Sequence, residues 1–176
     1  MRAFLLPSLA LVLAAASAAA ERGLPAVSRT LDNGMAAVVA EDRGEPVAAL
    51  QIWVRAGSVF EGERAGSGMS HLLEHLAFKG DEGRSDGEIP RAVQALGGDV
   101  NAFTSFDRTV FHVRLPSRNW ERGLELLTRL VFGIEIDPEM METEKKVVLR
   151  EIAMKMDEPD SRLSRLMWET AYLAHP

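Results

Sequence analysis

The residues best suited to catalysis form one short motif, His71-Leu72-Leu73-Glu74-His75. In a helix, residues four apart lie on one face about one turn apart, so both imidazoles can reach one metal ion. Two histidine nitrogens at roughly 2.0–2.1 Å are typical ligands of Zn²⁺. The Glu74 carboxylate can take a proton from a water molecule on the metal and later deliver it to a leaving amine. The motif therefore predicts a hydrolytic zinc site.

The competing interpretation is that both histidines are ordinary surface residues of a helix. The chain contains only four histidines, so two at this spacing with a glutamate between them are an infrequent coincidence. Leu72 and Leu73 also indicate a partly buried helix, in which unpaired polar groups are costly. Both observations favour a metal site.

A catalytic zinc site needs a third protein ligand, for which there are several candidates. His112 lies in a strand-like pattern and fits a sheet residue better, whereas His175 stands next to the last residue. Glu144 and Glu151 are seven residues apart, which places them on one helix face about 10.5 Å apart along the axis. Spacing alone does not separate a metal-ligating carboxylate from a solvated, charged helix.

The composition fits a globular protein and excludes several other classes. The 176 residues are 47% hydrophobic and carry a net charge of −6 without any basic run, which argues against nucleic-acid binding. The chain has no cysteine, which excludes disulfides, thiolate metal sites and a lipid-bearing cysteine.

The N-terminus has the features of a secretory signal peptide. A positive residue precedes an almost wholly apolar run, and the small residues Ala18 and Ala20 come directly before a charged pair. The run is shorter than the roughly 20 residues that span a bilayer, and Pro7 interrupts it. We therefore expect a signal peptide at residues 1–20, a mature domain at 21–176 without a membrane span, and export to the bacterial periplasm.

Residue patterns predict alternating groups of strands and helices. Strands are expected at residues 27–31, 35–40, 47–56, 100–105 and 109–115, with a hairpin turn at Asn33-Gly34 and a loop at 57–68. Helices are expected from Ser67 or Ser70 to Lys79 with a stop at Gly80, from a capping box at 85–88 to Gly97, from Ser117 to Phe132, from Asp137 to Met156, and from Pro159 onwards.

The order of these elements predicts an α+β fold with an antiparallel sheet, because hairpin-length connections join the strands. In the helix from Ser117, we expect Leu124, Leu127, Leu130 and Val131 to form the apolar face. The chain stops at Pro176 directly after the last expected helix, so we expect a domain that is incomplete at its C-terminus.

Five longer motifs surround the candidate site residues. They are H-L-L-E-H-L-A-F-K-G from His71, N-A-F-T-S from Asn101, E-K-K-V-V-L-R-E from Glu144, T-L-D-N-G-M from Thr30 and V-x-A-G-S from Val54. In order and spacing they resemble the pitrilysin/insulinase/mitochondrial-processing-peptidase family, whose H-x-x-E-H motif inverts the commoner H-E-x-x-H arrangement.

This resemblance assigns roles to individual residues. It implies one Zn²⁺ per chain, held by His71, His75 and Glu151, with Glu74 as the general base. Glu144 would not contact the metal itself but would orient the ligands that do. The four residues expected to bind substrate are Asn101, Ala102, Phe103 and Thr104, on an edge strand to which an extended peptide can add. Without the resemblance, Asn101 reads as a turn residue after Gly97-Gly98-Asp99.

The resemblance also implies an activity and a domain organisation. We expect the N-terminal domain of a zinc endopeptidase, with helices packed on one face of its sheet, that cleaves extended peptides or small unfolded proteins. A second homologous domain or subunit would close over the zinc and contact the substrate. The alternatives are a catalytically silent scaffold or partner subunit of a two-chain peptidase, and an exported metal-binding protein without hydrolase activity.

Overall fold

The computed structural model describes residues 26–64, 66–79 and 87–172, and the chain divides into two compact units, Met1–Glu45 and Pro46–Pro176. The expected signal peptide at residues 1–20 lies outside the described residues. No helix in the described ranges is long and apolar enough to cross a membrane.

The first unit contains a β-hairpin. Strand β1 (Ala26–Thr30) pairs antiparallel with β2 (Ala36–Ala40), and the backbone N–H of Leu31 donates to the carbonyl of Met35 at 2.8 Å. The Asn33 side chain accepts a hydrogen bond from the Met35 N–H at 3.1 Å. Gly34 has a φ of +84°, which glycine adopts at little cost. The predicted hairpin at Asn33-Gly34 is confirmed.

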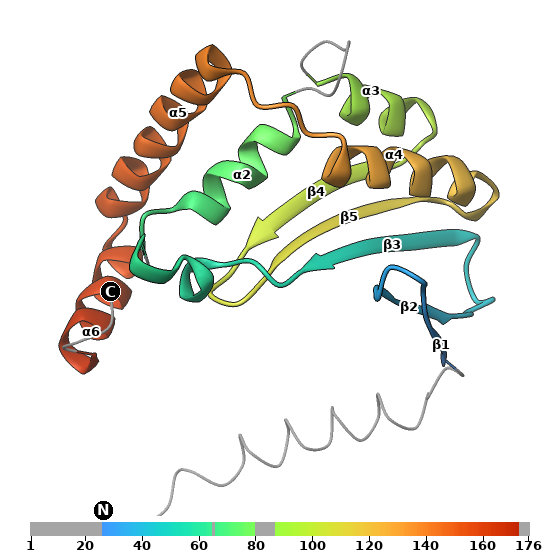
Figure 1. Ribbon diagram of the computed structural model, residues 1–176, viewed down its shortest axis with the longest axis horizontal. Helices are drawn as coiled ribbons and strands as arrows, with labels where there is room; N and C mark the ends of the chain where they lie inside the picture. Colours follow the sequence, from blue (N-terminus) through green and yellow to red (C-terminus); the bar gives the residue numbers. More distant parts are fainter. Residues whose placement is uncertain (1–25, 65, 80–86, 173–176) are drawn as a thin grey trace, which may run out of the picture. The chain divides into compact units, whose positions relative to one another are not determined.

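The second unit is built on a three-stranded antiparallel sheet (Figure 1). Its strands are β3 (Val47–Val54), β4 (Asp99–Thr104) and β5 (Thr109–Pro116), in the order β3-β5-β4. In β5, Phe111, Val113 and Leu115 are buried, whereas Arg114 is exposed on the opposite face, as the alternation of a strand requires. Strand β4 forms an edge of this sheet.

Three helices cover one face of this sheet, and two more extend the helical layer (Figure 1). They are α2 (Met69–Ala77), α3 (Glu88–Ala95) and α4 (Trp120–Phe132); α5 (Pro138–Asp157) packs against α2, and α6 (Pro159–Ala171) packs against α5. The core lies between sheet and helices, where Val93, Val113, Leu126 and Leu127 are fully buried. The predicted α+β fold with an antiparallel sheet is confirmed.

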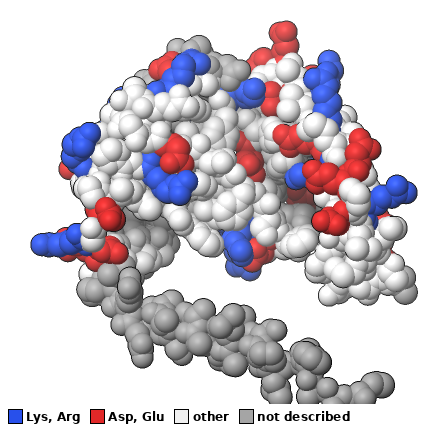
Figure 2. Space-filling view, turned by 180° about the vertical axis from the view of Figure 1, so that it is seen from behind, with Lys and Arg blue, Asp and Glu red and all other residues white. Residues whose placement is uncertain are grey.

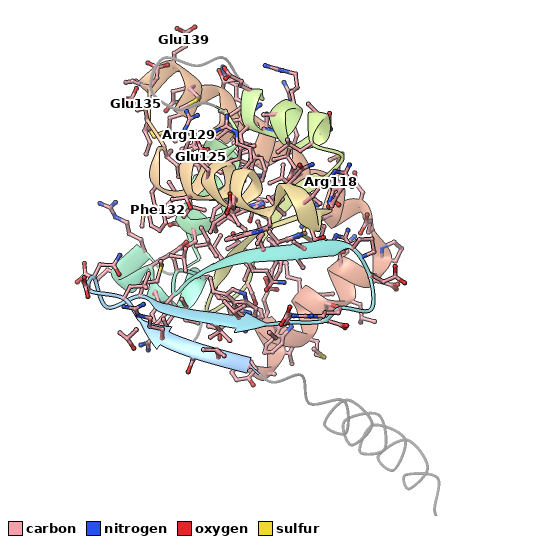
Figure 3. The ribbon with its side chains drawn as sticks, turned by 90° about the vertical axis from the view of Figure 1, so that its right-hand side faces the viewer. Arg118, Glu125, Arg129, Phe132, Glu135 and Glu139 are labelled. Atoms are coloured by element: carbon pink, nitrogen blue, oxygen red, sulfur yellow. The ribbon has the colours of Figure 1, made fainter. Side chains whose placement is uncertain are left out.

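Helix α4 differs from its prediction in its start and in its apolar face. Ser117 begins a short 3₁₀ turn (Ser117–Asn119) and makes no capping hydrogen bond, so α4 starts at Trp120. Leu124 is 41% exposed, while Leu126 is fully buried. Arg118 in the 3₁₀ turn and Glu125 in α4 are exposed, and Arg129 near the end of α4 is partly exposed (Figure 3).

Gly123 allows α4 to pack closely against the sheet. A Cβ atom at Gly123 would come within 2.2 Å of the Leu115 side chain. A side chain at this position would therefore force Leu115 to move, so glycine allows the close approach of α4 to the sheet.

The predicted start of α5 agrees with the structure, whereas the predicted start of α3 depends on residues outside the described ranges. At α5, the Asp137 side chain accepts from the Met140 N–H at 3.0 Å and Pro138 occupies the first turn, as predicted. At α3 the capping residue is Gly87, with φ of +71°, while residues 85 and 86 of the expected capping box lie outside the described residues. The expected helix stop at Gly80 lies outside them as well. The loop at 57–68 contains two 3₁₀ turns, Ser58–Phe60 and Gly62–Arg64.

Candidate metal centre

The two histidines of the motif project from one side of α2. Their ring centroids are 4.8 Å apart with the planes nearly perpendicular, and the side chains are 30% and 17% exposed for His71 and His75. Leu76 and Ala77 of the same helix are buried at 3% exposure. The apolar side of α2 is therefore anchored in the core, which leaves the imidazoles at the accessible side.

The start of α2 is held by an acidic side chain from the preceding loop. Neither Ser67 nor Ser70 caps the helix, so that prediction is wrong; Gly68, with φ of +77°, precedes its first turn. The buried carboxylate of Glu61 accepts a hydrogen bond from the Ser70 N–H at 2.8 Å and from the Ser67 hydroxyl at 3.2 Å. These interactions satisfy donors that the first turn of a helix leaves free.

The same hydrogen bonds perturb the ionisation of Glu61. Burial by itself raises the pKa of this carboxyl, but the hydrogen bonds from the backbone and hydroxyl of Ser70 and from Ser67 outweigh it. The net result is a pKa below the ordinary value. Glu61 thus stabilises α2 as an anion, next to the positive end of the helix.

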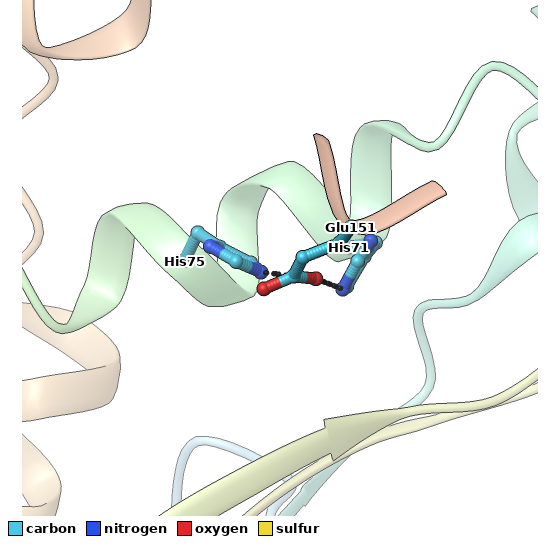
Figure 4. Close-up of side chains that lie close together, drawn as sticks. All are labelled: His71, His75 and Glu151. Atoms are coloured by element: carbon cyan, nitrogen blue, oxygen red, sulfur yellow. Dashed lines mark ion pairs between the residues drawn. The ribbon is translucent and has the colours of Figure 1, made fainter. Parts of the chain in front are cut away.

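Helix α5 brings a carboxylate to the two imidazoles. The Oε2 atom of Glu151 lies 3.7 Å from Nε2 of His71 and 3.5 Å from Nε2 of His75 (Figure 4). One ligand atom from each of the three residues lies within 4.8 Å of the other two. Among the described residues, this is the one group of histidine and acidic side chains that could hold a metal ion.

The donor set and its spacing fit zinc. Tetrahedral ligands at roughly 2.0–2.2 Å from zinc are about 3.3 Å from one another. The two separations that involve Glu151, 3.7 and 3.5 Å, are close to this value. Two imidazoles and one carboxylate are also a donor set that leaves a fourth position open for water or substrate.

A second carboxylate of α5 lies behind His75. The Oε2 atom of Glu144 is 3.4 Å from Nδ1 of His75, and its Oε1 atom is 3.1 Å from Nζ of Lys79. Glu144 is only 2% exposed, and its Oε2 atom has no hydrogen-bond partner within bonding geometry. A buried anion beside the outer nitrogen of an imidazole is the usual arrangement behind a metal-bound histidine.

Glu74, the fourth residue of the motif, faces strand β4 of the sheet. Its Oε2 atom accepts a hydrogen bond from the Thr104 hydroxyl at 2.5 Å. The Thr104 hydroxyl lies 3.3 Å from that of Thr109, which donates to the Ala56 carbonyl at 3.0 Å. A chain of polar contacts therefore runs from the carboxylate of α2 to the backbone at the end of β3.

The strand expected to receive substrate forms the edge of the sheet, but its side chains divide between two faces. Thr104 and Ala102 lie on the side of the helices, and Asn101 and the 45% exposed Phe103 lie on the other by alternation. The Asn101 side-chain oxygen accepts from the N–H of Ala102 at 2.8 Å. An incoming peptide that uses either group would have to replace this local bond.

His112, the other histidine within the described residues, does not join this group. His112 lies in β5, paired with Gln51 and Asn101, as the strand interpretation predicted. His175 lies outside the described residues.

A view from behind shows acidic side chains gathered near a hollow on the side of α5 (Figure 2).

A largely apolar cavity of about 570 Å³ lies at the other side of α2. Leu72, Leu73 and Leu76 line it together with residues of β3, β5 and the connection between α4 and α5. Glu74 reaches this lining, but the two histidines do not. The metal-ligand group is therefore separate from the cavity, and Glu74 lies where the two adjoin.

Comparison with known proteins assigns the chain to a family. A model described as Insulinase (Peptidase family M16) matches residues 37–176, which is most of the sequence. The chain belongs to peptidase family M16. This finding confirms the resemblance that the motifs indicated.

Curated M16 relatives include proteases and a processing subunit. The chain is 32% identical over 146 residues to mitochondrial-processing peptidase subunit beta from Bos taurus, a match that covers 81% of this chain and 29% of that protein. It is 32% identical over 147 residues to an uncharacterized zinc protease from Mycobacterium leprae, covering 84% and 33%. The chain thus spans about a third or less of the length of these relatives.

Solved structures share the fold. A protease from Helicobacter pylori matches with a TM-score of 0.73 and 29% identity, covering 79% of this chain and 33% of that one. A peptidase M16 inactive domain from Pseudomonas fluorescens matches with a TM-score of 0.73 and 21% identity, covering 83% and 35%, which supports the fold alone. Family membership therefore includes domains that are not active.

Several residues around the site could not be recognised from the sequence. Glu61 holds the start of α2 from eight residues before the helix, and no capping pattern includes such a partner. Lys79 pairs with Glu144 although 65 residues separate them. Thr104 was expected at the substrate, but in this structure its hydroxyl bonds Glu74.

Proposed function

We propose that the full-length protein is a zinc-dependent endopeptidase that hydrolyses peptide bonds in extended peptides or small unfolded proteins. The observation that carries the proposal is the meeting of His71, His75 and Glu151 from two helices, with Glu74 on the same helix as both imidazoles. A bare metal-binding site has no need of Glu74, whereas amide hydrolysis needs a group that moves protons.

Each residue then has a defined task. His71, His75 and Glu151 would hold Zn²⁺, and Glu144 would keep the His75 ring in place through its Nδ1. When bound, zinc polarises the scissile carbonyl and lowers the pKa of a bound water to about 7. Glu74 takes the proton of the attacking water and delivers it to the leaving nitrogen, so that the carboxylate is regenerated in each cycle.

The edge strand β4 supports the proposed substrate class. An extended peptide can pair with the free edge of β4 through backbone hydrogen bonds, which favours binding of unfolded segments over folded ones. Asn101, Ala102, Phe103 and Thr104 make up the segment of β4 nearest its C-terminal end. We assign this segment to substrate binding, with Asn101 as the contact to the peptide backbone.

A second homologous domain or subunit is part of the proposal. The M16 relatives are about three times longer than the matched region, and the bovine relative is by name a subunit. Groups that bind the substrate from the opposite side would come from a further domain or chain.

The test is the substitution Glu74→Gln in the full-length protein. We expect peptide hydrolysis to disappear while one zinc per chain is retained, because glutamine preserves size but cannot take up the proton. Hydrolysis that survives in Glu74→Gln would show the assignment of the base to be wrong. Zinc binding without any hydrolysis in the wild type would favour the silent scaffold or partner subunit instead.

Export to the periplasm is a further part of the proposal and rests on the first 20 residues alone. The small residues Ala18 and Ala20 end an apolar run of the length typical for a signal peptide. The zinc endopeptidase would then act on peptides outside the cytoplasm.

A further inference from the structure

We infer that Thr104 is a positioning residue for Glu74: its hydroxyl donates a hydrogen bond to the carboxylate that serves as the base and sets the orientation of that carboxylate. This inference rests on the proposed function, and it assigns the Thr104 side chain to the enzyme's own machinery rather than to the substrate. The strand that would receive the peptide and the hydroxyl that holds the base are then parts of one element.

The contact itself joins two elements that are distant in sequence. Thr104 is the last residue of β4 and Glu74 lies 30 residues earlier in α2, yet the hydroxyl and Oε2 are 2.5 Å apart. Both residues are partly buried. A charge-assisted hydrogen bond in such surroundings holds a carboxylate more firmly than a contact with bulk water does.

The buried Thr109 lies next to the Thr104 hydroxyl. Thr109 is only 4% exposed, and its hydroxyl donates to the Ala56 carbonyl at 3.0 Å. Each hydroxyl carries one proton, so with Thr109 bonded to Ala56 and Thr104 bonded to Glu74, the 3.3 Å separation of their oxygens is a contact without a hydrogen bond. The hydrogen bond to Glu74 is therefore the contact that orients the Thr104 hydroxyl, and Thr109 lies beside it.

The geometry separates this task from peptide binding. A peptide that adds to the edge of β4 uses backbone donors and acceptors of the strand. The Thr104 side chain instead points to the helical side, where it reaches Glu74. Removing the hydroxyl should therefore disturb the base without removing the groups that bind the peptide backbone.

The experiment compares Thr104→Val with Thr104→Ser in the full-length protein. Valine has nearly the shape of threonine without the hydroxyl, and serine retains the hydroxyl. We expect Thr104→Val to lower kcat on the order of 10- to 100-fold, as small misplacements of a catalytic group do, with little change in KM and with one zinc retained. Thr104→Ser should keep most of the activity.

Thr170→Val serves as the matched control, since the exposed Thr170 bonds only within α6, to the Leu166 carbonyl at 2.7 Å. Wild-type kcat in Thr104→Val would overturn the inference. A rise in KM that is equal in the valine and serine variants would do the same, because it would indicate a role in substrate contact or in folding. If Thr104→Val does not fold, Thr104→Ala removes the same hydroxyl.

A crystal structure gives a readout that does not depend on activity. In Thr104→Val, the Glu74 carboxylate should leave its position beside β4, whereas in Thr104→Ser it should stay. An unmoved Glu74 in the valine variant would refute the inference even if kcat falls. Failure of the proposed function is distinguishable, because a wild type that hydrolyses no peptide removes that function but leaves the Glu74 displacement measurable.

Discussion

Glu144 lies against the outer nitrogen of His75, with 3.4 Å between Oε2 and Nδ1, while Glu151 of the same helix lies 3.5 Å from Nε2 of that ring. One imidazole is thus held between two carboxylates that are seven residues apart in α5. Residues two turns apart, about 10.5 Å along the axis, lie on one face of a helix, so both carboxylates of α5 can reach the same ring. This relationship explains why both acidic residues occur at this spacing.

Glu144→Gln should weaken zinc binding without removing a direct ligand. The substitution removes the negative charge beside Nδ1, so His75 becomes a poorer and less well oriented ligand. We expect the zinc affinity to fall about 10- to 100-fold, measured by competition with a chelator. Glu142→Gln is the control, since Glu142 is exposed on the same helix and pairs with Lys145. Equal affinities in the two variants would contradict a role for Glu144 at the site.

Glu151→Gln should weaken zinc binding further than Glu144→Gln does. The amide oxygen of glutamine is neutral, and zinc prefers carboxylate, imidazole and thiolate ligands. Metal analysis after dialysis should find less than one zinc per chain, whereas Glu169→Gln, on the exposed side of α6, should retain a full equivalent. Unchanged stoichiometry and affinity would move the third ligand to another residue.

Glu61→Gln should reduce stability in a pH-dependent manner. The lowered pKa of Glu61 means that its contribution is fully present above the ordinary pKa of about 4.5 and is lost as the pH falls through the folded-state value. We expect a loss of about 1 kcal/mol at neutral pH, typical of a helix cap, that shrinks in acid. Chemical unfolding between pH 3 and 7 measures this difference. The exposed Glu63→Gln is the control, and a pH-independent difference would speak against an ionised cap.

Gly57→Ala should destabilise the protein for a steric reason. Gly57 has an extended backbone that any residue can adopt, but a Cβ there would lie 2.5 Å from the carbonyl oxygens of Ser105 and Phe106. Since these are backbone atoms, relief requires movement of the β4–β5 turn, at about 1–3 kcal/mol. Thermal unfolding should show a lower Tm than for Gly44→Ala, whose Cβ would meet only the Asp42 side chain. Equal Tm values would show that the turn moves freely.

Export should leave a mature protein that begins at Glu21. Mass spectrometry of the protein from its native host is expected to find the chain without residues 1–20, in the soluble periplasmic fraction. Ala20→Gln should block this cleavage, because the site requires a small residue, and Ala10→Leu within the apolar run should not. A protein that retains Met1 and its full N-terminus would refute the signal peptide.

Short-range features of this chain follow from the sequence itself, because the periodicity of the backbone determines them. The four-residue spacing of His71 and His75 places both rings on one face of any helix that includes them. The Asn33-Gly34 turn, the alternation in β5 and the Asp137-Pro138 start of α5 are equally local, and each agrees with the structure. The family motifs extended this reading to Glu144 and Glu151.

Only the tertiary structure decides which distant groups meet. Spacing left open whether the acidic residues of α5 face a metal or solvent, and the packing of α5 on α2 brings Glu151 to the imidazoles. The cap of α2 by Glu61 and the hydroxyl of Thr104 on Glu74 depend on where a loop and a strand are placed. Such contacts depend on how the whole core packs, and Gly123, which lets α4 approach Leu115 closely, shows how one residue changes that packing.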